Sequence, residues 1–403
     1  MNIRFPLLLD GAMGTQLHKK GLTPGCCPEQ WVLEHPEVCE SIQRAYVDAG
    51  SQVIYAPTFG ASSAVMESHG IFSEVEAYNR ALVGLARRTA GESALVAGDI
   101  SSVGAMLYPL GDTSFEELYG VYLEQAQALE NAGVDLFVIE TMTNVAEARA
   151  ALLAVKEVST KPVFVSFSCD ANGKTMMGTD VCAALQIMQS MGADAFGLNC
   201  SVGPAEMIPQ LRRLYEYAYI PLIAKPNAGL PESVDGETVF SVDAETFAGY
   251  IPALAEAGAS IFGACCGSDE TYIAAIRRAL NDVSVRAPAP KKTELFPCAT
   301  EKELFLLDPA LEDMEVYACD DELEDNISEP DKGQILGIEI RSLEDVAAFS
   351  DVQYAIRNPL CLICDDAALL EKALRAYQGT AIYSGTLGED VLLPLAKKYG
   401  LIL

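Results

Sequence analysis

Three cysteines of this 403-residue chain combine a residue type and a spacing that could do chemistry. Cys265 and Cys266 are adjacent and follow a short apolar run, and Cys200 follows another such run. If both runs are strands of one barrel, their carboxyl ends lie together and the three thiols converge. Three thiolates can hold a soft divalent metal such as zinc and leave one position open. The spacing alone leaves a second interpretation open, in which these cysteines are buried small hydrophobic residues.

The segment from Pro6 to about Asp282 provides a scaffold that could bring these cysteines together. It repeats eight times a short apolar run, a turn and an amphipathic helical pattern, for example the helices expected at 114–131 and 145–158. This count is typical of a (β/α)8 barrel, so we predict the class α/β, with a TIM barrel and a small C-terminal α/β appendage. The predicted strands are Pro6–Asp10, Gln52–Ala56, Leu95–Asp99, Leu136–Glu140, Pro162–Ser168, Ala195–Asn199, Pro221–Lys225 and Ser260–Ala264.

The residues at the ends of the predicted strands are the informative ones, because barrel enzymes place their catalytic groups there. They include thiols, carboxylates and amides, which we expect to surround one mouth. Strand by strand, these residues are Asp10, Glu140 with Thr141, Asn199 with Cys200, Lys225 with Asn227, and Cys265 with Cys266.

The overall charge excludes some classes of partner. The chain has 57 acidic and 27 basic residues, a formal net charge of -30, which would repel nucleic acid and anionic membranes. No apolar run is long enough to span a bilayer, and the N-terminus shows no signal-peptide pattern. We therefore expect a soluble, cytoplasmic protein whose twelve cysteines are reduced thiols.

The three histidines, His18, His35 and His69, all lie in the first quarter of the chain. This distribution argues against histidine-based metal sites and catalytic triads near Cys200 and Cys265. It also argues against a cobalamin-binding module within this chain, because the Asp-x-His-x-x-Gly loop of that fold cannot be written with these histidines.

The sequence changes character after the predicted barrel, so we divide the chain into a barrel (1–285), a Pro-rich linker (286–300) and a C-terminal region (301–403). Residues 301–331 contain thirteen acidic residues and one basic residue, which favours a solvated acidic surface or a mobile loop. They lack the spacing of a calcium-binding EF-hand loop. Strands and helices are then expected to alternate over 334–340, 343–349, 360–364, 367–377, 380–383 and 391–399.

Two further cysteine pairs are not predicted to do chemistry. Cys361 and Cys364 have CxxC spacing, but they fall in a predicted strand, where their side chains point to opposite faces and pack. Cys26 and Cys27 lie in a loop flanked by proline and glycine, where we do not favour a metal site.

Five motifs together resemble the homocysteine S-methyltransferase family, in the correct order and over roughly the first 280 residues. The opening motif is more similar to the homocysteine domain of cobalamin-dependent methionine synthase than to the betaine or S-methylmethionine enzymes. The motifs are Asp10-Gly11-Ala12-Met13-Gly14-Thr15, Glu140-Thr141, Gly197-Leu198-Asn199-Cys200, Lys225-Pro226-Asn227-Ala228-Gly229 and Gly263-Ala264-Cys265-Cys266-Gly267.

The resemblance implies a zinc ion that activates the thiol of homocysteine for methyl transfer, giving methionine. The implied zinc ligands are Cys200, Cys265 and Cys266, with the substrate sulfur as the fourth. Asn227 matches the position that binds the metal before substrate arrives. The substrate ammonium is expected near Asp10 and Glu140, and its carboxylate at the backbone amides of the turn formed by Gly11, Ala12, Met13, Gly14 and Thr15.

The methyl donor is less constrained by the sequence. The tail loosely resembles early βα units of a pterin-binding barrel, but about a hundred residues cannot hold a complete one. We therefore expect methylcobalamin or methyl-folate to be supplied by a separate corrinoid or folate protein. The alternatives are S-methylmethionine or S-adenosylmethionine as donor, or a non-catalytic homocysteine-binding subunit. Where the family commonly has Thr-Asn-Thr-Phe, this chain has Ala56-Pro57-Thr58-Phe59, so its thiol selectivity could differ.

Overall fold

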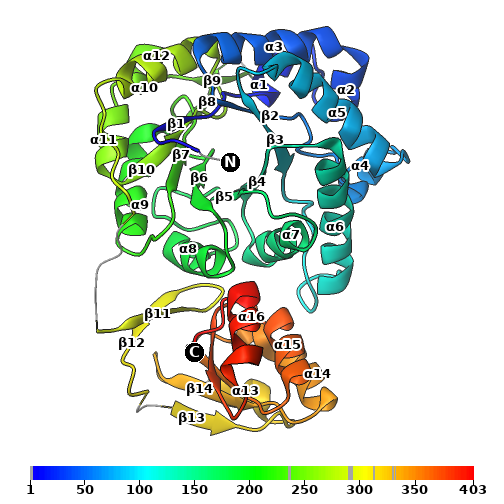
Figure 1. Cartoon of the computed structure of the whole chain (residues 1–403), viewed down its shortest axis with the longest axis vertical. Helices are drawn as coiled ribbons and strands as arrows, with labels where there is room; N and C mark the ends of the chain where they lie inside the picture. Colours follow the sequence, from blue (N-terminus) through cyan, green and yellow to red (C-terminus); the bar gives the residue numbers. More distant parts are fainter. Residues whose placement is uncertain (1–2, 235–236, 289–293, 312–313, 329–330, 332) are drawn as a thin grey trace.

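The computed structural model describes residues 3–234, 237–288, 294–311, 314–328, 331 and 333–403. Its larger part is a nearly closed barrel of eight parallel strands with helices around it (Figure 1). All eight predicted barrel strands are confirmed, with shifts of a few residues at their ends. They are β1 (Leu7–Leu8), β2 (Val53–Tyr55), β3 (Leu95–Ile100), β4 (Leu136–Met142), β5 (Val163–Phe167), β6 (Ala195–Asn199), β7 (Leu222–Lys225) and β10 (Ala259–Phe262).

The strands follow the order β1-β10-β7-β6-β5-β4-β3-β2. Two hydrogen bonds join the ends of this series, because the Gln52 amide donates to Leu8 O at 2.8 Å and the Leu8 amide donates to Gln52 Oε1 at 2.9 Å. Alternate side chains fill the barrel interior, as Leu136 and Val138 of β4 do, while Phe137 and Ile139 pack outward among the helices. The barrel is therefore a packed core that opens only at its mouth.

Capping residues in the local sequence set where the helices around the barrel begin and end. Ser114 caps α6 by accepting a hydrogen bond from the Glu117 amide, and Gly50 and Gly133 end α3 and α6 in the left-handed conformation. The barrel helices are α1 (Gly14–Lys19), α2 (Pro28–Glu34), α3 (Pro36–Ala49), α4 (Ser63–Ser68), α5 (Val75–Ala90), α6 (Phe115–Ala132), α7 (Val145–Val158), α8 (Val181–Ser190), α9 (Pro204–Tyr215), α10 (Ala244–Ala248), α11 (Ile251–Glu256) and α12 (Glu270–Leu280).

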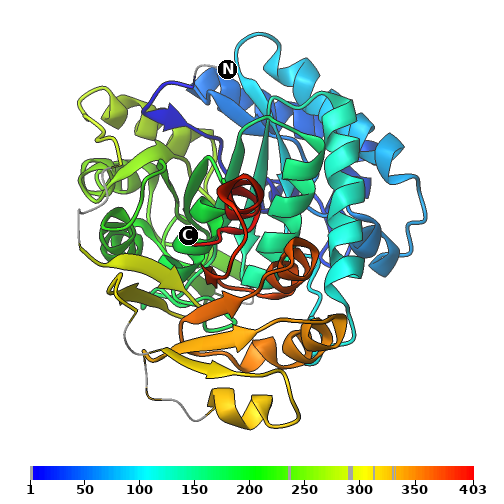
Figure 2. The same ribbon diagram turned by 60° about the horizontal axis from the view of Figure 1, so that its bottom comes forward.

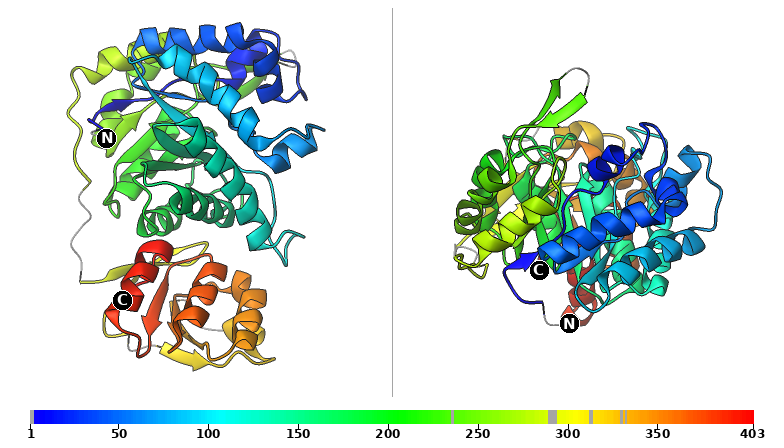
Figure 3. Two further views of the ribbon diagram at one scale, coloured as in Figure 1. Left: turned by 45° about the vertical axis from the view of Figure 1, so that its right-hand side comes forward. Right: turned by 90° about the horizontal axis from the view of Figure 1, so that it is seen from above.

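A β-hairpin that the sequence did not predict follows β7. Its strands are β8 (Pro231–Val234) and β9 (Glu237–Phe240), and it projects from the barrel in the right panel of Figure 3. At its base, Phe240 packs against Gly267, where an added Cβ would lie 2.4 Å from the ring. The hairpin therefore helps to hold the loop that carries Cys265 and Cys266.

The C-terminal region folds as a four-stranded parallel sheet with helices on one face (Figures 1 and 2). Its other face carries an antiparallel hairpin, whose Cys298 and Leu307 pack against Ile335 and Cys361. The hairpin is β11 (Phe296–Ala299) and β12 (Leu304–Leu307). The sheet and its helices are β13 (Met314–Tyr317), α13 (Leu323–Ser328), β14 (Ile335–Glu339), α14 (Leu343–Val352), η1 (Gln353–Ala355), β15 (Leu360–Ile363), α15 (Ala367–Ala376), β16 (Ala381–Ser384) and α16 (Glu389–Tyr399).

Two expectations for this region need correction. The end of the segment predicted as linker forms β11, because Cys298 and Ala299 are buried against the sheet. Of the two interpretations of the acidic segment, the mobile loop is wrong where the structure describes it, since the segment holds β12, β13 and α13, and α13 buries Leu323 and Ile327. Most of its described acidic side chains are exposed, as a solvated acidic surface requires. The later predicted strands and helices are confirmed. Cys361 and Cys364 pack into separate hydrophobic cores, as expected for residues on opposite faces.

The C-terminal domain packs against α7 and α8 of the barrel (Figure 1). Arg149 of α7 is fully buried there and donates to Leu374 O at 3.0 Å and to Gln378 Oε1 at 3.2 Å. Arg375 forms an ion pair with Glu116 at the start of α6. The contact leaves the barrel mouth open. Within the described ranges, no helix has both the length and the apolar character needed to cross a bilayer.

Candidate functional site

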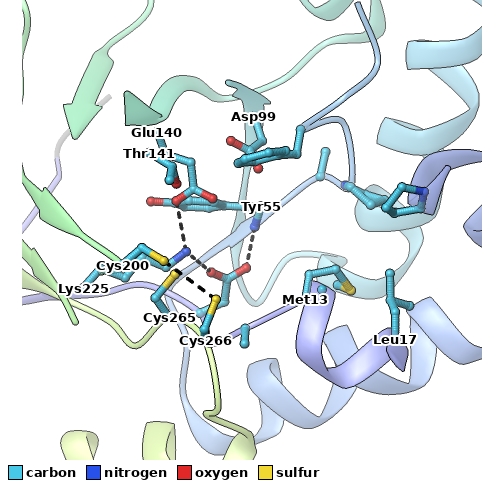
Figure 4. A pocket seen from close by; sticks show the side chains of 18 of the residues that line it. Met13, Leu17, Tyr55, Asp99, Glu140, Thr141, Cys200, Lys225, Cys265 and Cys266 are labelled. Carbon is cyan, nitrogen blue, oxygen red and sulfur yellow. Dashed lines mark hydrogen bonds and ion pairs between the residues drawn. The ribbon is translucent and has the colours of Figure 1, made fainter. Parts of the chain in front are cut away.

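The barrel mouth contains a cavity of about 320 Å³, which is at the small end of the range for ligand sites. Figure 4 shows the side chains that point into it. Most polar groups come from the strand ends, and most apolar groups come from α1, α2 and the loop after β2. The lining residues are Asp10, Gly11, Ala12, Met13, Gly14, Leu17, Pro28, Glu29, Val32, Tyr55, Ala56, Pro57, Phe59, Asp99, Glu140, Thr141, Cys200, Lys225, Cys265 and Cys266.

The structure brings the three cysteines together at one side of this cavity. Cys200 directly follows β6, and Cys265 and Cys266 follow β10. The sulfur atoms of Cys200 and Cys266 lie 3.8 Å apart, and all three sulfur atoms lie within 4.8 Å of one another. Among the described residues, this is the one cluster of three such side chains close enough to share a metal ion.

The backbone around these thiols is strained and tightly tied. Cys200 and Ser201 both adopt positive φ angles, 59° and 56°, which non-glycine residues rarely do. The Cys265 amide donates to Pro226 O at 2.8 Å, and the Ala228 amide donates to Cys266 O at 2.9 Å. The loops after β6, β7 and β10 therefore hold the thiols in place from three strands.

The electrostatics of the thiols favour a cation between them. Hydrogen bonds from Cys265 and Cys266 lower the pKa of the Cys200 thiol, and the same contacts raise the pKa values of Cys265 and Cys266. Three thiols this close cannot all ionise without a compensating positive charge. The buried Asn227 Oδ1 has no hydrogen-bond partner, although its side chain reaches Cys200. Three sulfur atoms and one free amide oxygen fit a zinc ion.

A buried lysine lies beside the thiols and links two carboxylates. Lys225 Nζ lies 3.4 Å from Asp10 Oδ1 and 3.3 Å from Glu140 Oε2, and 4.0 Å from the centre of the Tyr55 ring. Burial raises the pKa of Asp10, and it raises that of Glu140 to about 7 despite the lysine. Burial lowers the pKa of Lys225, but the carboxylates outweigh this and raise it well above its usual value.

Asp99, the residue before the last of β3, also faces the cavity and is buried. Its backbone is fixed, because its amide donates to Thr58 Oγ1 at 3.0 Å and the Thr58 hydroxyl donates to Asp99 O at 2.8 Å. Its carboxylate Oδ1 has no partner. Burial, and then the charge of Glu140, raise the pKa of Asp99 well above its usual range.

The sequence reasoning did not assign a role to Lys225 or Asp99, although both end predicted strands. Asn199, by contrast, has a positioning role. It donates to Thr141 Oγ1 at 2.7 Å and accepts from the Thr141 amide at 3.0 Å and from Ser166 Oγ at 2.9 Å. Thr141 adopts a φ of 59°, so Asn199 stabilises the unusual turn that follows Glu140.

The turn from Gly11 to Thr15 is joined to the loop of the eighth strand. The Ala12 amide donates to Ser268 Oγ at 3.1 Å, and the Gly267 amide donates to Thr15 Oγ1 at 3.3 Å. Only glycine fits at position 11, because a Cβ would lie 2.7 Å from the Tyr46 ring. The amide of Ala12 is therefore engaged, while the first-turn amides of α1 have no acceptor within their helix.

The other end of the cavity is largely apolar, with Met13, Leu17 and Val32 among its lining residues. Pro57, which departs from the family pattern, lies in this wall and offers no side-chain hydrogen bond. Glu29 is buried here, but its oxygens are engaged. Oε1 accepts from the Gly60 amide at 2.6 Å and Oε2 accepts from Cys27 Sγ at 3.3 Å.

Comparisons of sequence connect the barrel with known proteins. A family model described as homocysteine S-methyltransferase matches residues 7–280. The methionine synthases of Mycobacterium leprae and Mycobacterium tuberculosis are 33% identical over 292 residues and 32% identical over 295 residues. These matches cover 67% and 68% of this chain but 24% of each relative, so the chain spans about a quarter of their length.

Comparisons with solved structures agree with the sequence matches. The metallated form of the homocysteine methyltransferase MmuM from Escherichia coli superimposes with a TM-score of 0.58 and 25% identity, and covers 68% of this chain and 95% of that one. The oxidized form gives a TM-score of 0.56 and 26% identity over the same shares. The family match ends at residue 280, so the C-terminal domain lies outside it.

Proposed function

The chain belongs to the homocysteine S-methyltransferase family, and on that premise we propose that it transfers a methyl group to the thiol of L-homocysteine, giving methionine, with zinc as its metal. The observation that carries the proposal is the convergence of three cysteine sulfurs within 4.8 Å, in the wall of a cavity that also holds buried carboxylates. Thiolates suit a soft metal, and carboxylates suit the ammonium group of an amino acid.

We propose that Cys200, Cys265 and Cys266 hold the zinc, and that Asn227 supplies the fourth ligand when substrate is absent. The buried Asn227 Oδ1 without a partner supports this role. When bound, zinc lowers the pKa of a thiol, so that a substrate sulfur is present as thiolate at neutral pH.

The residues of the chain then bind and orient the substrate. The carboxylates at the strand ends attract its ammonium group, and the glycine-containing turn after β1 offers amides to its carboxylate. In the chemical step the homocysteine sulfur attacks the sp³ methyl carbon, so that the new S–C bond forms as the bond between the methyl group and its donor breaks, and the donor leaves with that electron pair. A thiolate needs little help from a general base, which agrees with a cavity wall whose described residues include no histidine.

We propose that the methyl group comes from a separate corrinoid or folate protein as methylcobalamin or methyl-folate. The support is the similarity to two methionine synthases, of which this chain spans about a quarter. Direct transfer from S-methylmethionine or S-adenosylmethionine is the second candidate, because the barrel also resembles a protein named only as a homocysteine methyltransferase, a name that specifies no donor. A homocysteine-binding subunit that turns over only with its partner is the third.

The test combines metal analysis with a panel of donors. Purified protein should contain about one zinc per chain, and Cys265→Ala should lose it. Cys26→Ala, which changes an exposed cysteine away from the cavity, is the matched control and should retain zinc. Methionine formation should then be measured with methylcobalamin, methyl-folate with its carrier protein, S-methylmethionine and S-adenosylmethionine. Zinc-free protein with full activity would overturn the proposal.

A further inference from the structure

The turn that carries Cys200 needs support from outside itself. Cys200 and Ser201 both hold positive φ angles, and such backbone persists only where the surrounding structure fixes it. Part of the support comes from β7, since the Cys200 amide donates to Lys225 O at 3.2 Å. The Ser201 hydroxyl shares a hydrogen bond with the hydroxyl of Ser168, which directly follows β5. The loop that begins at Ser168 therefore bears on the position of a thiol in the candidate metal site.

This loop, residues 168–180, is called the β5 loop below, and hydrogen bonds make it compact. The Asp170 amide donates to Lys174 O, and the Lys174 amide donates to Asp170 Oδ1, both at 2.9 Å. Lys174 in turn pairs with Asp180, and its Nζ lies 3.5 Å from Asp180 Oδ2. The far end of the β5 loop, at Asp180, is thus connected with Asp170, two residues from Ser168.

The C-terminal domain holds the far end of the β5 loop through one residue. Lys302 Nζ donates to Met177 O at 2.8 Å, and the Asp180 amide donates to Lys302 O at 2.9 Å. Lys302 is the single basic residue among the thirteen acidic residues of the segment 301–331. Glu301, at 2.8 Å, balances its charge. The one lysine of an acidic segment is therefore directed at the barrel.

The turn that presents Lys302 is anchored to its own domain. It joins β11 to β12, and the hairpin packs against α8, the helix that follows the β5 loop (Figure 1). Thr300 is fully buried in this turn, its amide donates to Glu303 O at 3.0 Å, and its Oγ1 accepts from the Lys302 amide at 3.3 Å. The Thr380 amide, just before β16, donates to Ala299 O at 2.7 Å. Lys302 is thus held in place by the C-terminal sheet.

We propose that Lys302 is a positioning residue for the candidate metal site. Through Lys302 and the β5 loop, the C-terminal domain holds Ser168 against Ser201 and so keeps the Cys200 thiol where it can bind zinc. The inference rests on the proposed function, and it gives a role to the domain that lies outside the family match. Lys302 lies outside the cavity wall, so it acts through the loop. Without this contact the strained turn can relax, and zinc should leave faster.

The experiment measures how fast the zinc-loaded full chain releases zinc to an excess of a coloured chelator. Lys302→Met and Ser168→Ala should each release zinc about threefold to tenfold faster than wild type, the effect expected for the loss of one hydrogen bond. The double variant should release zinc no faster than the faster single variant, because both changes break the same connection. Lys302→Arg, which retains a donor for Met177 O, should restore most of the wild-type rate.

Arg341→Met is the matched control, because Arg341 is an exposed basic residue of the same domain whose ion-pair partner, Glu339, also lies in that domain. It should release zinc at the wild-type rate. In metal-free protein, hydrogen exchange at the amides of residues 200–202 should be faster in Lys302→Met than in Arg341→Met, which reports on the turn itself. Thermal unfolding of each variant shows whether the fold is intact.

The possible results separate this inference from the proposed function. Wild type that holds no zinc overturns the proposed function, and hydrogen exchange of the metal-free variants then decides whether Lys302 positions the turn. Wild type that holds zinc, with an unchanged release rate or unchanged exchange in Lys302→Met, overturns the role of Lys302 and leaves the function standing. Effects of the two single variants that multiply in the double variant also overturn it, because Lys302 and Ser168 would then act independently.

Discussion

The barrel and the C-terminal domain each present the carboxyl ends of parallel strands, and the two edges use similar residues differently. Both edges carry cysteines and paired acids. In the C-terminal domain, Asp365 accepts from the Thr386 amide and hydroxyl, both at 2.8 Å, and Asp366 accepts from the Ala368 and Leu369 amides at the start of α15. The polar groups of this edge are thus engaged in holding the fold.

At the barrel mouth, the same kinds of residue are left without partners. Asp99 Oδ1 and Asn227 Oδ1 are buried and accept no hydrogen bond, and Asp10 Oδ1 has only its ion pair with Lys225. Three of the four described non-glycine residues with positive φ, Thr141, Cys200 and Ser201, also lie here. Buried carboxylate oxygens without a hydrogen bond and strained backbone both lower stability, so their coincidence at one edge marks the place prepared for a ligand. A position at the end of a strand does not by itself indicate a ligand site.

The largest expected contrast is between a cysteine of the barrel mouth and a cysteine packed within the C-terminal sheet. Cys200→Ala should lose zinc and lower methyl-transfer activity by at least about a hundredfold, with little loss of stability, because we propose the removed thiol as a metal ligand. Cys361→Ala should keep zinc and activity but lower the free energy of unfolding by about 1–3 kcal/mol, because Cys361 is fully packed.

Metal analysis, activity assays and urea unfolding, carried out on both variants, check this contrast. A Cys361 variant that lost zinc, or a Cys200 variant that kept it, would remove the distinction between the cysteines of the mouth and those of the C-terminal core.

The second contrast concerns the buried lysine. Lys225→Met leaves Asp10 and Glu140 without their cation and should cost about 3–5 kcal/mol in urea unfolding, as expected when one partner of a buried ion pair is removed. Lys398→Met is the matched control in the C-terminal domain, where the partner Glu371 is partly exposed, so the loss should be below about 1 kcal/mol. Equal losses would mean that the lysine at the mouth has no special energetic role.

These residues also show what the sequence could and could not predict. The eight barrel strands were predictable because strands buried on both faces are short, nearly continuous apolar runs. The rule about strand ends located the thiols and included Lys225 among the residues of the mouth, but it did not single out Asp99. It did not reveal that Lys225 pairs with Glu140, 85 positions away, because such pairing depends on the closed barrel.

Other elements could not be predicted because their local composition favours a loop. The hairpin of β8 and β9 lies in a stretch rich in proline, glycine and acidic residues, whose composition favours a loop. The strand β13 contains Glu315 within an acidic segment, and it forms because its backbone pairs in parallel with β14. Tertiary pairing overrides local composition in both cases.

The third contrast is the sign of a pH dependence. Burial raises the pKa of Glu140 to about 7, above its unfolded value of about 4.5, so the stability it contributes is complete below about pH 4.5 and is lost as the pH rises to 7. Wild type should therefore lose at most about 3 kcal/mol relative to Glu140→Gln over this window.

Asp365 should show the opposite sign. Hydrogen bonds from Thr386 lower its pKa, so its contribution is present above the unfolded value of about 3.8 and is lost as the pH falls. Urea unfolding of Glu140→Gln and Asp365→Asn against wild type between pH 3 and 8 measures both slopes. Two slopes of the same sign would show that these acids do not differ in the way that the structure indicates.

The smallest expected effect tests whether the unpartnered acid at the mouth lowers stability. Asp366→Ala removes the cap of α15 and should cost about 1 kcal/mol of unfolding free energy without changing the affinity for homocysteine. Asp99→Asn replaces a buried carboxyl group whose pKa burial raises well above its usual range and whose Oδ1 accepts no hydrogen bond, so in ligand-free protein it should be neutral or stabilising. Urea unfolding of the two variants measures the difference. If Asp99→Asn were the more destabilised of the two, Asp99 would stabilise the fold as the acids of the C-terminal edge do. Asp99 would then no longer support the interpretation that the barrel mouth keeps unpartnered polar groups for a ligand.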